Sequence, residues 1–264
     1  HGKGFKKIKK KVIIIFRGDA KGITSQFAPR SNGGRLIMVD LFGKTEFCGM
    51  EIKNPFFRSE THDKKADKTG HVTDDVMKSH KVLAKSGIGA IITGYANVCS
   101  TDQPSSNMFG IHDDSYISGY KQLTDMVHCF DTKIIMQIVY GGSPGQGDLG
   151  CNNVWGPSSV PHEKSCIEPV EMTIADIALL TEYFAKAAVR VKKSGFDGVQ
   201  LHGAHGYLLS QFLSPYYNRR KDRYGGHIEN RVRIILEIYH AIREAVGSSF
   251  PIMIKINSSD NREG

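Results

Sequence analysis

The sequence has few cysteines, and their spacing excludes two kinds of small, cross-linked or metal-stabilised domain. The five cysteines, at positions 48, 99, 129, 151 and 166, contain no CxxC pair, so neither a disulfide framework nor a zinc ribbon is indicated. Cys151 and Cys166 flank one loop and could pair, but free thiols in a reducing, cytoplasmic setting fit the spacing better. The sequence also lacks any run near the ~20 apolar residues of a membrane span. We therefore expect neither a structural disulfide nor a membrane partner.

Excess positive charge is confined to the N-terminal region. The chain carries a net charge of +8, and residues 1–35 contain ten Lys or Arg residues and one acid, a net +9, which leaves −1 for the rest. A nearly neutral body is not typical of a nucleic-acid-binding domain, in which basic residues gather on one face of the fold. The composition therefore predicts no nucleic-acid partner.

The N-terminal segment imitates the start of a signal peptide only in part. A basic stretch, Lys6–Lys11, precedes five apolar residues, Val12–Phe16. The hydrophobic region of a signal peptide has roughly 7–15 residues, so this one is too short. Residues 1–38 also show no sustained helix or strand periodicity that joins the rest. We predict that residues 1–40 form a basic, poorly ordered tail and that residues 41–264 form the folded domain.

From Leu41 onward, short apolar runs of β type alternate with longer segments of helical period. The five predicted strands are Phe56–Ser59, Ala90–Thr93, Lys133–Val139, Gly198–His202 and Pro251–Ile256. The predicted helices are Thr73–Ser86, Asp113–Phe130, Thr173–Ser194 and Ile228–Val246. A hairpin is predicted at Glu46–Asn54, and a long loop at residues 140–172. Strand–helix alternation with apolar strands indicates a parallel sheet covered by helices.

Two folds fit this pattern, and a missing glycine motif helps to decide between them. A doubly wound sheet predicts a glycine-rich phosphate turn after the first strand, but that turn reads SETHDKKADKTG and contains no GxGxxG. A (β/α)8 barrel predicts polar residues just past the carboxyl end of each strand, and such residues follow all five predicted strands. The sequence therefore predicts a TIM-type (β/α)8 barrel truncated after about the fifth strand. We expect five parallel strands in chain order, helices outside, and an open gap.

The densest polar cluster follows the fourth strand, in the segment LHGAHGYLLSQFLSP. His202, His205 and Tyr207 in this segment have three interpretations. The histidines could donate hydrogen bonds to a carbonyl oxygen, with Tyr207 as proton donor. They could share a metal ion, although no HExxH motif or nearby carboxylate supplies a third ligand, or all three could simply pack in the core. The donor pair is favoured, so no metal is expected, and the two rings should aim their nitrogens at one point above the strand ends.

Two polar residues stand inside apolar strands, Gln137 in KIIMQIV and Lys255 in PIMIKI. A buried amide or ammonium needs a partner. Gln137 suits a cofactor ring that offers both a donor and an acceptor, or a hydrogen bond to a neighbouring strand. Lys255 suits an anionic ligand or a salt bridge within the barrel. We expect both side chains on the same side of the sheet as His202 and His205.

One segment, HGAHGYLLSQFLSPYYNRRKDRYGGHIENRVR, resembles the region after the fourth strand of old yellow enzyme-type flavin oxidoreductases. That family includes NADH:flavin oxidoreductases and the 2,4-dienoyl-CoA reductase and bile-acid reductase branches. Further motifs agree in the same order: LFGKTEFCGMEIKNPFFRSETH, HVTDDVMKSHKVLAKSGIGAIITGYANV, GIHDDSYISGYKQLTDMVH and KIIMQIVYGG. The resemblance covers about Leu41 to the C-terminus, and residues 1–40 have no counterpart in it.

The resemblance implies FMN in the barrel mouth and NADH or NADPH as the reductant of an activated C=C bond in a small enone or enoyl substrate. His202 and His205 would bind the activating carbonyl group, and Tyr207 would protonate the α-carbon. The cofactor contacts that the resemblance implies are Ser59, Glu60, Thr61, His62, Tyr95, Gln137 and Lys255. Among these, Gln137 would bond the pyrimidine edge of the flavin.

Several positions depart from the family's pattern. Lys255 takes a place usually held by arginine, and His62 one usually held by Thr or Cys. Glu60 stands where Pro or Ala is common, and Pro55 where relatives have Arg.

The family's FMN phosphate is held by loops after the seventh and eighth strands, whereas this chain begins with His1 and ends at Gly264, just past the fifth. We therefore expect a fragment of an NAD(P)H-dependent flavin oxidoreductase that binds FMN weakly or not at all alone. An iron–sulfur cluster and an oligomer are left open for the parent protein. The alternative is a catalytically incomplete barrel fragment with no cofactor bound.

Overall fold

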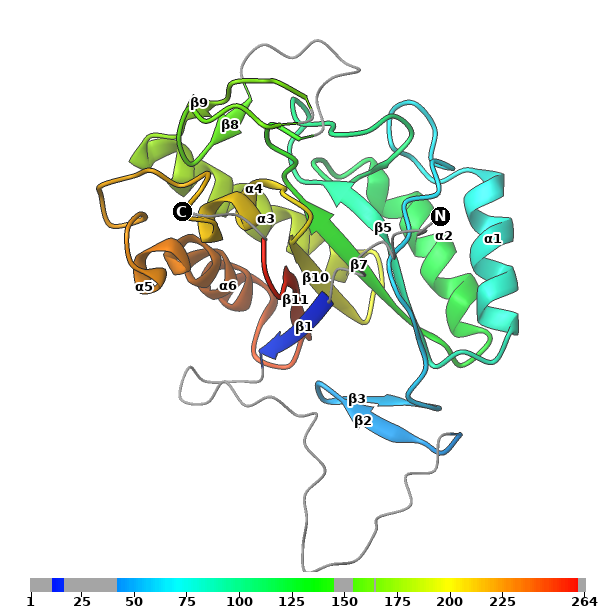
Figure 1. Ribbon diagram of the computed structural model, residues 1–264. Helices are drawn as coiled ribbons and strands as arrows, with labels where there is room; N and C mark the ends of the chain where they lie inside the picture. The colour runs from blue at the N-terminus through cyan, green and yellow to red at the C-terminus, as the bar shows by residue number, and fades with distance from the viewer. Residues whose placement is uncertain (1–10, 17–41, 145–153, 164, 261–264) are drawn as a thin grey trace, which may run out of the picture.

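The computed structural model describes residues 11–16, 42–144, 154–163 and 165–260, and its centre is a parallel sheet with helices packed outside it (Figure 1). Five strands lie side by side in chain order: β4 (Phe57–Arg58), β5 (Ala90–Asn97), β7 (Lys133–Val139), β10 (Gly198–Gly203) and β11 (Ile252–Asn257). Each neighbouring pair is parallel. A short strand, β6 (Phe109–Gly110), pairs with the end of β5. The predicted part of a (β/α)8 barrel is confirmed.

A helix follows each of the first four strands of this series. These helices are α1 (Asp74–Lys85), α2 (Tyr116–His128), α3 (Ile174–Lys193) and α6 (Arg233–Val246). Two short helices, α4 (Leu208–Leu213) and α5 (Ile228–Arg231), precede α6. The helix predicted at Ile228–Val246 is thus divided at Val232, and α4 was not expected.

The sequence of α3 shows why these helices form where they do. The Oγ1 of Thr173 accepts the Asp176 N–H at 3.1 Å, and the Asp176 carboxylate accepts the Thr173 N–H at 2.8 Å. This capping box satisfies backbone donors that the first turn leaves free. The face that the helical period predicts is buried, with Ile177, Leu180, Phe184, Ala188 and Val191. Burial of this face holds α3 against the sheet.

Apolar side chains pack on both faces of the sheet. The larger cluster lies between the sheet and the helices. The smaller one involves the predicted hairpin, formed by β2 (Thr45–Phe47) and β3 (Met50–Ile52). Its members are Met50, Ile52, Ala90, Ile92, Ile135 and Met253. The hairpin therefore fills the inner face of the sheet near its amino end, which leaves the carboxyl end to polar side chains.

One strand differs from what the sequence led us to expect. Lys11–Phe16 forms β1, which pairs antiparallel with β11 from Lys11 opposite Asn257 to Phe16 opposite Ile252. Residues 1–40 were expected to contribute no strand, and the edge beside β11 was expected to stay open. An edge strand presents unpaired N–H and C=O groups, and the β-branched sequence VIII favours extended pairing with them. The rest of the predicted tail lies outside the described residues.

The described part of the sheet has two ends, at β1 and β4, which do not pair with each other. The segment predicted as a long loop contains a two-residue parallel pairing between β8 (Trp155–Gly156) and β9 (Val170–Glu171). Within the described ranges, no helix is both long enough and apolar enough to cross a membrane.

Candidate active site

Three predicted site residues lie on one face of the sheet. In the parallel register, Gln137 of β7 lies beside Gln200 of β10, and His202 lies beside Lys255 of β11. In-register neighbours point to the same face, as do residues two apart along a strand. Met253, two residues before Lys255, belongs to the cluster that contains the hairpin, so this is the inner face. Gln137, His202 and Lys255 are all buried there.

A tight turn after β10 brings His205 and Tyr207 back over the strand ends. His205 and Gly206 have left-handed backbone angles, with φ of +61° and +83°. Glycine adopts this conformation freely, and histidine does so more readily than most residues. The His205 N–H donates to the Oδ1 of Asn257, at the end of β11, over 3.3 Å. Tyr207 then precedes the first turn of α4 as its N-cap residue.

Four rings gather at this point. The ring centroid of His202 lies 5.0 Å from that of His205, 4.8 Å from that of Tyr207 and 6.0 Å from that of Tyr95. The Tyr207 hydroxyl donates to the Tyr95 hydroxyl over 3.3 Å. The structure thus brings together the three residues predicted to be catalytic and one predicted to contact the cofactor. That the nitrogens of the two histidines meet at one point stays a prediction.

The protonation of this cluster follows from its hydrogen bonds and its burial. The Nδ1 of His202 accepts the Ala204 N–H at 3.3 Å, so the neutral ring carries its proton on Nε2. Burial, and next the neighbouring Tyr95, raises the pKa of Tyr207. Its phenol therefore stays protonated at neutral pH. His202 thus presents a ring N–H on Nε2, and Tyr207 keeps its O–H, which it donates to Tyr95.

The loop after β4, residues 59–62, adds a fifth ring to the cluster. His62 stacks on Tyr95 with a centroid distance of 4.7 Å, and its Nε2 lies 3.0 Å from the Ser105 hydroxyl. Burial, followed by the charge of Lys64, lowers the pKa of His62. The ring is therefore neutral at pH 7, where it can donate or accept a hydrogen bond.

Glu60 and Lys255 form an ion pair that joins this loop to β11. Their side chains are only 5% and 2% exposed. The Ser59 hydroxyl donates to the other carboxylate oxygen of Glu60 over 2.9 Å. Ser59 and Thr61 themselves are exposed. Lys255 was expected to meet either an anionic ligand or a salt bridge, and the salt bridge is present. Its partner is Glu60, which had been expected to contact the cofactor.

Gln137 also has a partner within the protein, and sequence analysis missed it. The Nε2 of Gln137 donates to the Oε1 of Gln200 over 2.7 Å. Both glutamines are fully buried. The Oε1 of Gln137 and the Nε2 of Gln200 have no hydrogen-bond partner among the described residues. The signal for Gln200 was present, because it interrupts the apolar strand GVQLH as Gln137 interrupts KIIMQIV.

A bulge in β5 places Tyr95. The register between β5 and β7 shifts just before this residue, and the Oγ1 of Thr93 accepts the Gln137 N–H at 3.4 Å. Bulges re-aim side chains and are common beside active sites. A Cβ at Gly94 would lie 2.9 Å from the carbonyl oxygen of Thr61. Glycine is therefore required at this position for the loop after β4 to lie against β5.

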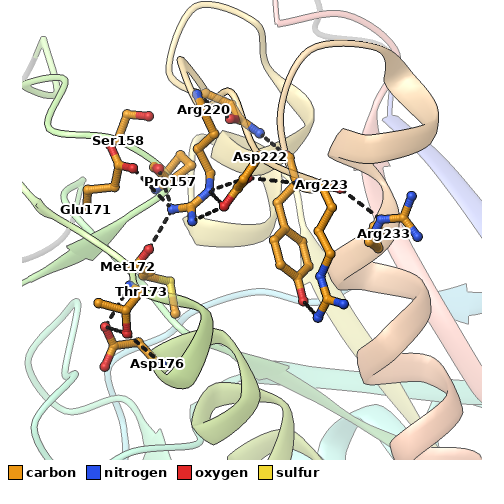
Figure 2. A network of polar contacts seen from close by, with 12 residues as sticks. Pro157, Ser158, Glu171, Met172, Thr173, Asp176, Arg220, Asp222, Arg223 and Arg233 are labelled. Carbon is orange, nitrogen blue, oxygen red and sulfur yellow. Dashed lines mark hydrogen bonds and ion pairs between the residues drawn. The ribbon is translucent and has the colours of Figure 1, made fainter.

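A buried arginine that sequence analysis did not single out braces the outer loops (Figure 2). The Arg220 guanidinium donates to the carbonyl oxygens of Pro157 at 3.1 Å and Met172 at 2.6 Å, and its Nε donates to Asp222 at 3.0 Å. These bonds tie the segment after α4 to the β8–β9 pair and to the start of α3. Nothing in the sequence NRRKDR distinguishes Arg220 from Arg219 or the more exposed Arg223.

A polar cavity of about 260 Å³ lies beside the ring cluster. His205 and Tyr207 form part of its wall, and His162, Tyr217 and Asn257 form another part. In the part of the chain that the structure describes, no three His, Cys, Asp or Glu side chains are grouped as metal ligands would be. Two of the four clustered rings, those of His205 and Tyr207, thus border a space that a small polar molecule can enter.

Comparison with known proteins identifies relatives over most of the chain. The model of the NADH:flavin oxidoreductase / NADH oxidase family matches residues 40–263. A metal reductase of Desulforamulus reducens is 36% identical over 230 residues, which are 86% of this chain and 34% of the relative. An NADH oxidase of Thermoanaerobacter brockii is 36% identical over 85% of this chain and 35% of its own length. An NADPH dehydrogenase of Bacillus licheniformis is 32% identical over 83% and 64%.

Solved structures show the same likeness in three dimensions. An old yellow enzyme from Pichia sp. superposes with a TM-score of 0.74 at 28% identity, over 80% of this chain and 58% of that one. A 2-naphthoyl-CoA reductase in complex with 2-naphthoyl-CoA superposes with a TM-score of 0.75 at 27% identity, over 80% and 34%. The chain thus spans between 34% and 64% of the length of these proteins.

Proposed function

The chain belongs to the NADH:flavin oxidoreductase / NADH oxidase family, and from that membership we propose that it carries the catalytic side chains of an FMN-dependent oxidoreductase. NADH or NADPH would be the reductant, and the substrate a small enone or enoyl compound whose activated C=C bond is reduced. The observation that carries this proposal is the gathering of His202, His205, Tyr207 and Tyr95 above the buried amides of Gln137 and Gln200.

The residues present fit a flavin. Two buried amide atoms, the Oε1 of Gln137 and the Nε2 of Gln200, lack partners among the described residues, and a buried polar atom without a partner costs stability. The pyrimidine edge of a flavin offers both an N–H and carbonyl oxygens. Lys255 places a cation on the same inner face, suited to the electron-rich part of that ring. His62 and Tyr95 supply ring surfaces nearby.

The side chains of the cluster have separate tasks in this proposal. When bound, FMN supplies the hydride chemistry between NAD(P)H and substrate. His202 donates its Nε2–H to the activating carbonyl oxygen, with His205 as the second donor, and so stabilises the charge that develops there. Tyr207 gives its hydroxyl proton to the α-carbon. In the structure that proton is donated to the Tyr95 hydroxyl, so the Tyr207 O–H must turn from Tyr95 toward the substrate for the transfer.

The experiment for this function begins with FMN. We expect the 264-residue chain to bind FMN more weakly than ~1 μM, because losing several charge-assisted phosphate contacts weakens binding by orders of magnitude. A polypeptide that contains this chain and matches its relatives in length should bind FMN and oxidise NADH or NADPH with 2-cyclohexenone as acceptor. The Tyr207→Phe variant should keep the binding and lose the enone reduction. A long polypeptide that binds no flavin would refute the proposed function.

A second candidate is a half-barrel that binds no cofactor and associates through its edges. The described sheet does not close, which favours this reading. The pairing of β1 with β11 disfavours it, because one edge is already covered. A flavin absorbance spectrum of the purified chain, before and after incubation with FMN, separates the two candidates.

A further inference from the structure

The paired glutamines on the inner face combine complete burial with unmet hydrogen bonding. Gln137 and Gln200 lie directly beside each other in the register of β7 and β10 and share one hydrogen bond of 2.7 Å. Neither side chain is accessible to solvent. One oxygen and one amide nitrogen remain without partners among the described residues. Natural proteins satisfy nearly all such groups, so each exception calls for a partner from outside the protein, either an ordered water or a ligand.

The chemistry that the pair offers does not depend on which way the amides are turned. If Gln137 donates to Gln200, the oxygen of Gln137 and the NH2 of Gln200 are left over. If both amides turn by 180°, the roles exchange, and again one acceptor and one donor remain. An adjacent acceptor and donor are complementary to an imide edge, in which an N–H stands next to a carbonyl group. If the neighbour at position 200 were apolar, no hydrogen bond would hold the Gln137 amide in one orientation. The amide could then present either its oxygen or its NH2 group to a ligand.

The position of the pair relates it to the ion pair of Glu60 and Lys255. Gln200 lies beside Met253 in the register, and His202 lies beside Lys255. Lys255 is therefore one layer of side chains closer to the carboxyl end of the strands than the glutamines are. A ring that reaches the glutamines from the mouth must pass the layer of the ion pair. A ligand edge that the glutamines bind would therefore also border the Glu60–Lys255 ion pair.

We propose that Gln200 is a positioning residue for the cofactor ring: its amide fixes the orientation of the Gln137 amide, and together the two recognise an imide edge by one accepted and one donated hydrogen bond. The inference rests on the proposed function, because the imide in question is the pyrimidine edge of a flavin. It adds a specificity that neither glutamine provides alone.

The test uses two ring probes that lack a phosphate and therefore report only on the ring contacts. Lumiflavin keeps the imide N–H, and 3-methyllumiflavin replaces that hydrogen with a methyl group. Titration of each probe into the 264-residue chain, followed by flavin fluorescence, gives two dissociation constants. We expect the unmodified chain to prefer lumiflavin by about tenfold, the size of one good hydrogen bond.

Three variants make the test specific. Gln200→Leu should reduce the preference to about twofold or less, because the freed Gln137 amide no longer presents a fixed acceptor. Gln200→Glu should keep the preference, since a carboxylate still accepts from the Nε2 of Gln137 and leaves its oxygen for the imide N–H, but it should weaken the binding of both probes about tenfold, because a carboxylate cannot donate to the neighbouring carbonyl group. Gln211→Leu is the matched control: Gln211 is another buried glutamine, which donates to the Ser143 hydroxyl over 2.8 Å, outside the cluster, and whose Oε1 also lacks a partner among the described residues.

The outcomes are distinguishable. A Gln200→Leu variant that keeps the tenfold preference overturns the role of Gln200 and leaves the proposed function standing. An unmodified chain that binds both probes equally overturns the imide recognition. Binding of neither probe by the unmodified chain at millimolar concentration overturns this inference, while FMN binding by the longer polypeptide would still support the proposed function. Circular dichroism of each variant shows whether it folds. If Gln200→Leu does not fold, Gln200→Glu decides, because unchanged affinity for both probes in that variant overturns the role of Gln200.

Discussion

The ion pair of Glu60 and Lys255 gives the sharpest prediction for stability. Its side chains are 5% and 2% exposed, so both charges have lost nearly all contact with water. Removal of one charge leaves the other buried without compensation, which typically costs ~3–5 kcal/mol of unfolding free energy. We expect Glu60→Gln and Lys255→Met each to lower the unfolding free energy by about that amount.

The double variant Glu60→Gln/Lys255→Met should behave quite differently. Replacing both members of a buried ion pair by uncharged residues removes both desolvation costs at once, and with hydrophobic replacements of similar size the change is often neutral or stabilising. The double variant should therefore lie within ~1 kcal/mol of the unmodified protein, so the coupling energy, which is the double loss minus the two single losses, should be at least ~5 kcal/mol in size. Urea unfolding followed by circular dichroism measures all four proteins.

The exposed pair of Lys44 and Glu51 is the matched control. Its side chains are 70% and 71% exposed, although its Nζ–Oε1 distance of 2.7 Å is that of a good ion pair. Surface pairs contribute little because water screens them, so Lys44→Met should leave the urea midpoint unchanged within error. Additive effects of Glu60→Gln and Lys255→Met, with no coupling, would refute the reasoning and show that the two charges do not depend on each other.

Three further predictions concern other parts of the fold. Arg220→Lys should lower the unfolding free energy by ~2–4 kcal/mol, since one ammonium cannot replace a planar group that binds two carbonyl oxygens and a carboxylate. Burial lowers the pKa of His80, so the unfolded state takes up its proton first as the pH falls. The stability that His80 contributes is thus complete above the unfolded pKa of about 6.5 and is lost as the pH falls toward the folded pKa. His80→Gln should therefore flatten urea midpoints measured between pH 7 and 5. A proline at Ile13 or at Ile14 should break β1 from β11 and produce concentration-dependent association, because one of these two adjacent N–H groups faces the partner strand.

Each of these has a control and an outcome that contradicts it. For Arg220, the control is Arg223→Lys, which should change the unfolding free energy little because Arg223 is more exposed. Equal losses of unfolding free energy in both variants would show that the bonds of the Arg220 guanidinium do not stabilise the fold. For His80, an unchanged pH profile in His80→Gln would assign the acid sensitivity to other groups. For β1, sedimentation velocity should detect association in at least one proline variant. If both variants remain monomeric, pairing with β1 is not what prevents association through the edge of β11.

The elements that the sequence predicted correctly are those coded by nearby residues. The strand KIIMQIV was located at Lys133–Val139, and α3 begins after its Thr173 cap, because apolar period and capping chemistry act over a few positions. The barrel class followed from the same local pattern, repeated five times. The site was indicated by residues that break an apolar run, above all Gln137 and Lys255, since burial of a polar group demands a reason.

What only the tertiary structure decided are the pairings between distant segments. Glu60 meets Lys255, Gln137 meets Gln200, and Lys11–Phe16 meets β11, although 195, 63 and more than 230 positions separate them. The local sequence says that a buried cation or amide needs a partner, but the partner is chosen by the strand register, and a shift of one residue turns every side chain to the other face. The bulge before Tyr95 has the same origin, in how β5 fits β7 and the loop at Thr61. Charge and period are properties of the chain, whereas complementarity between two segments exists only once the sheet has assembled.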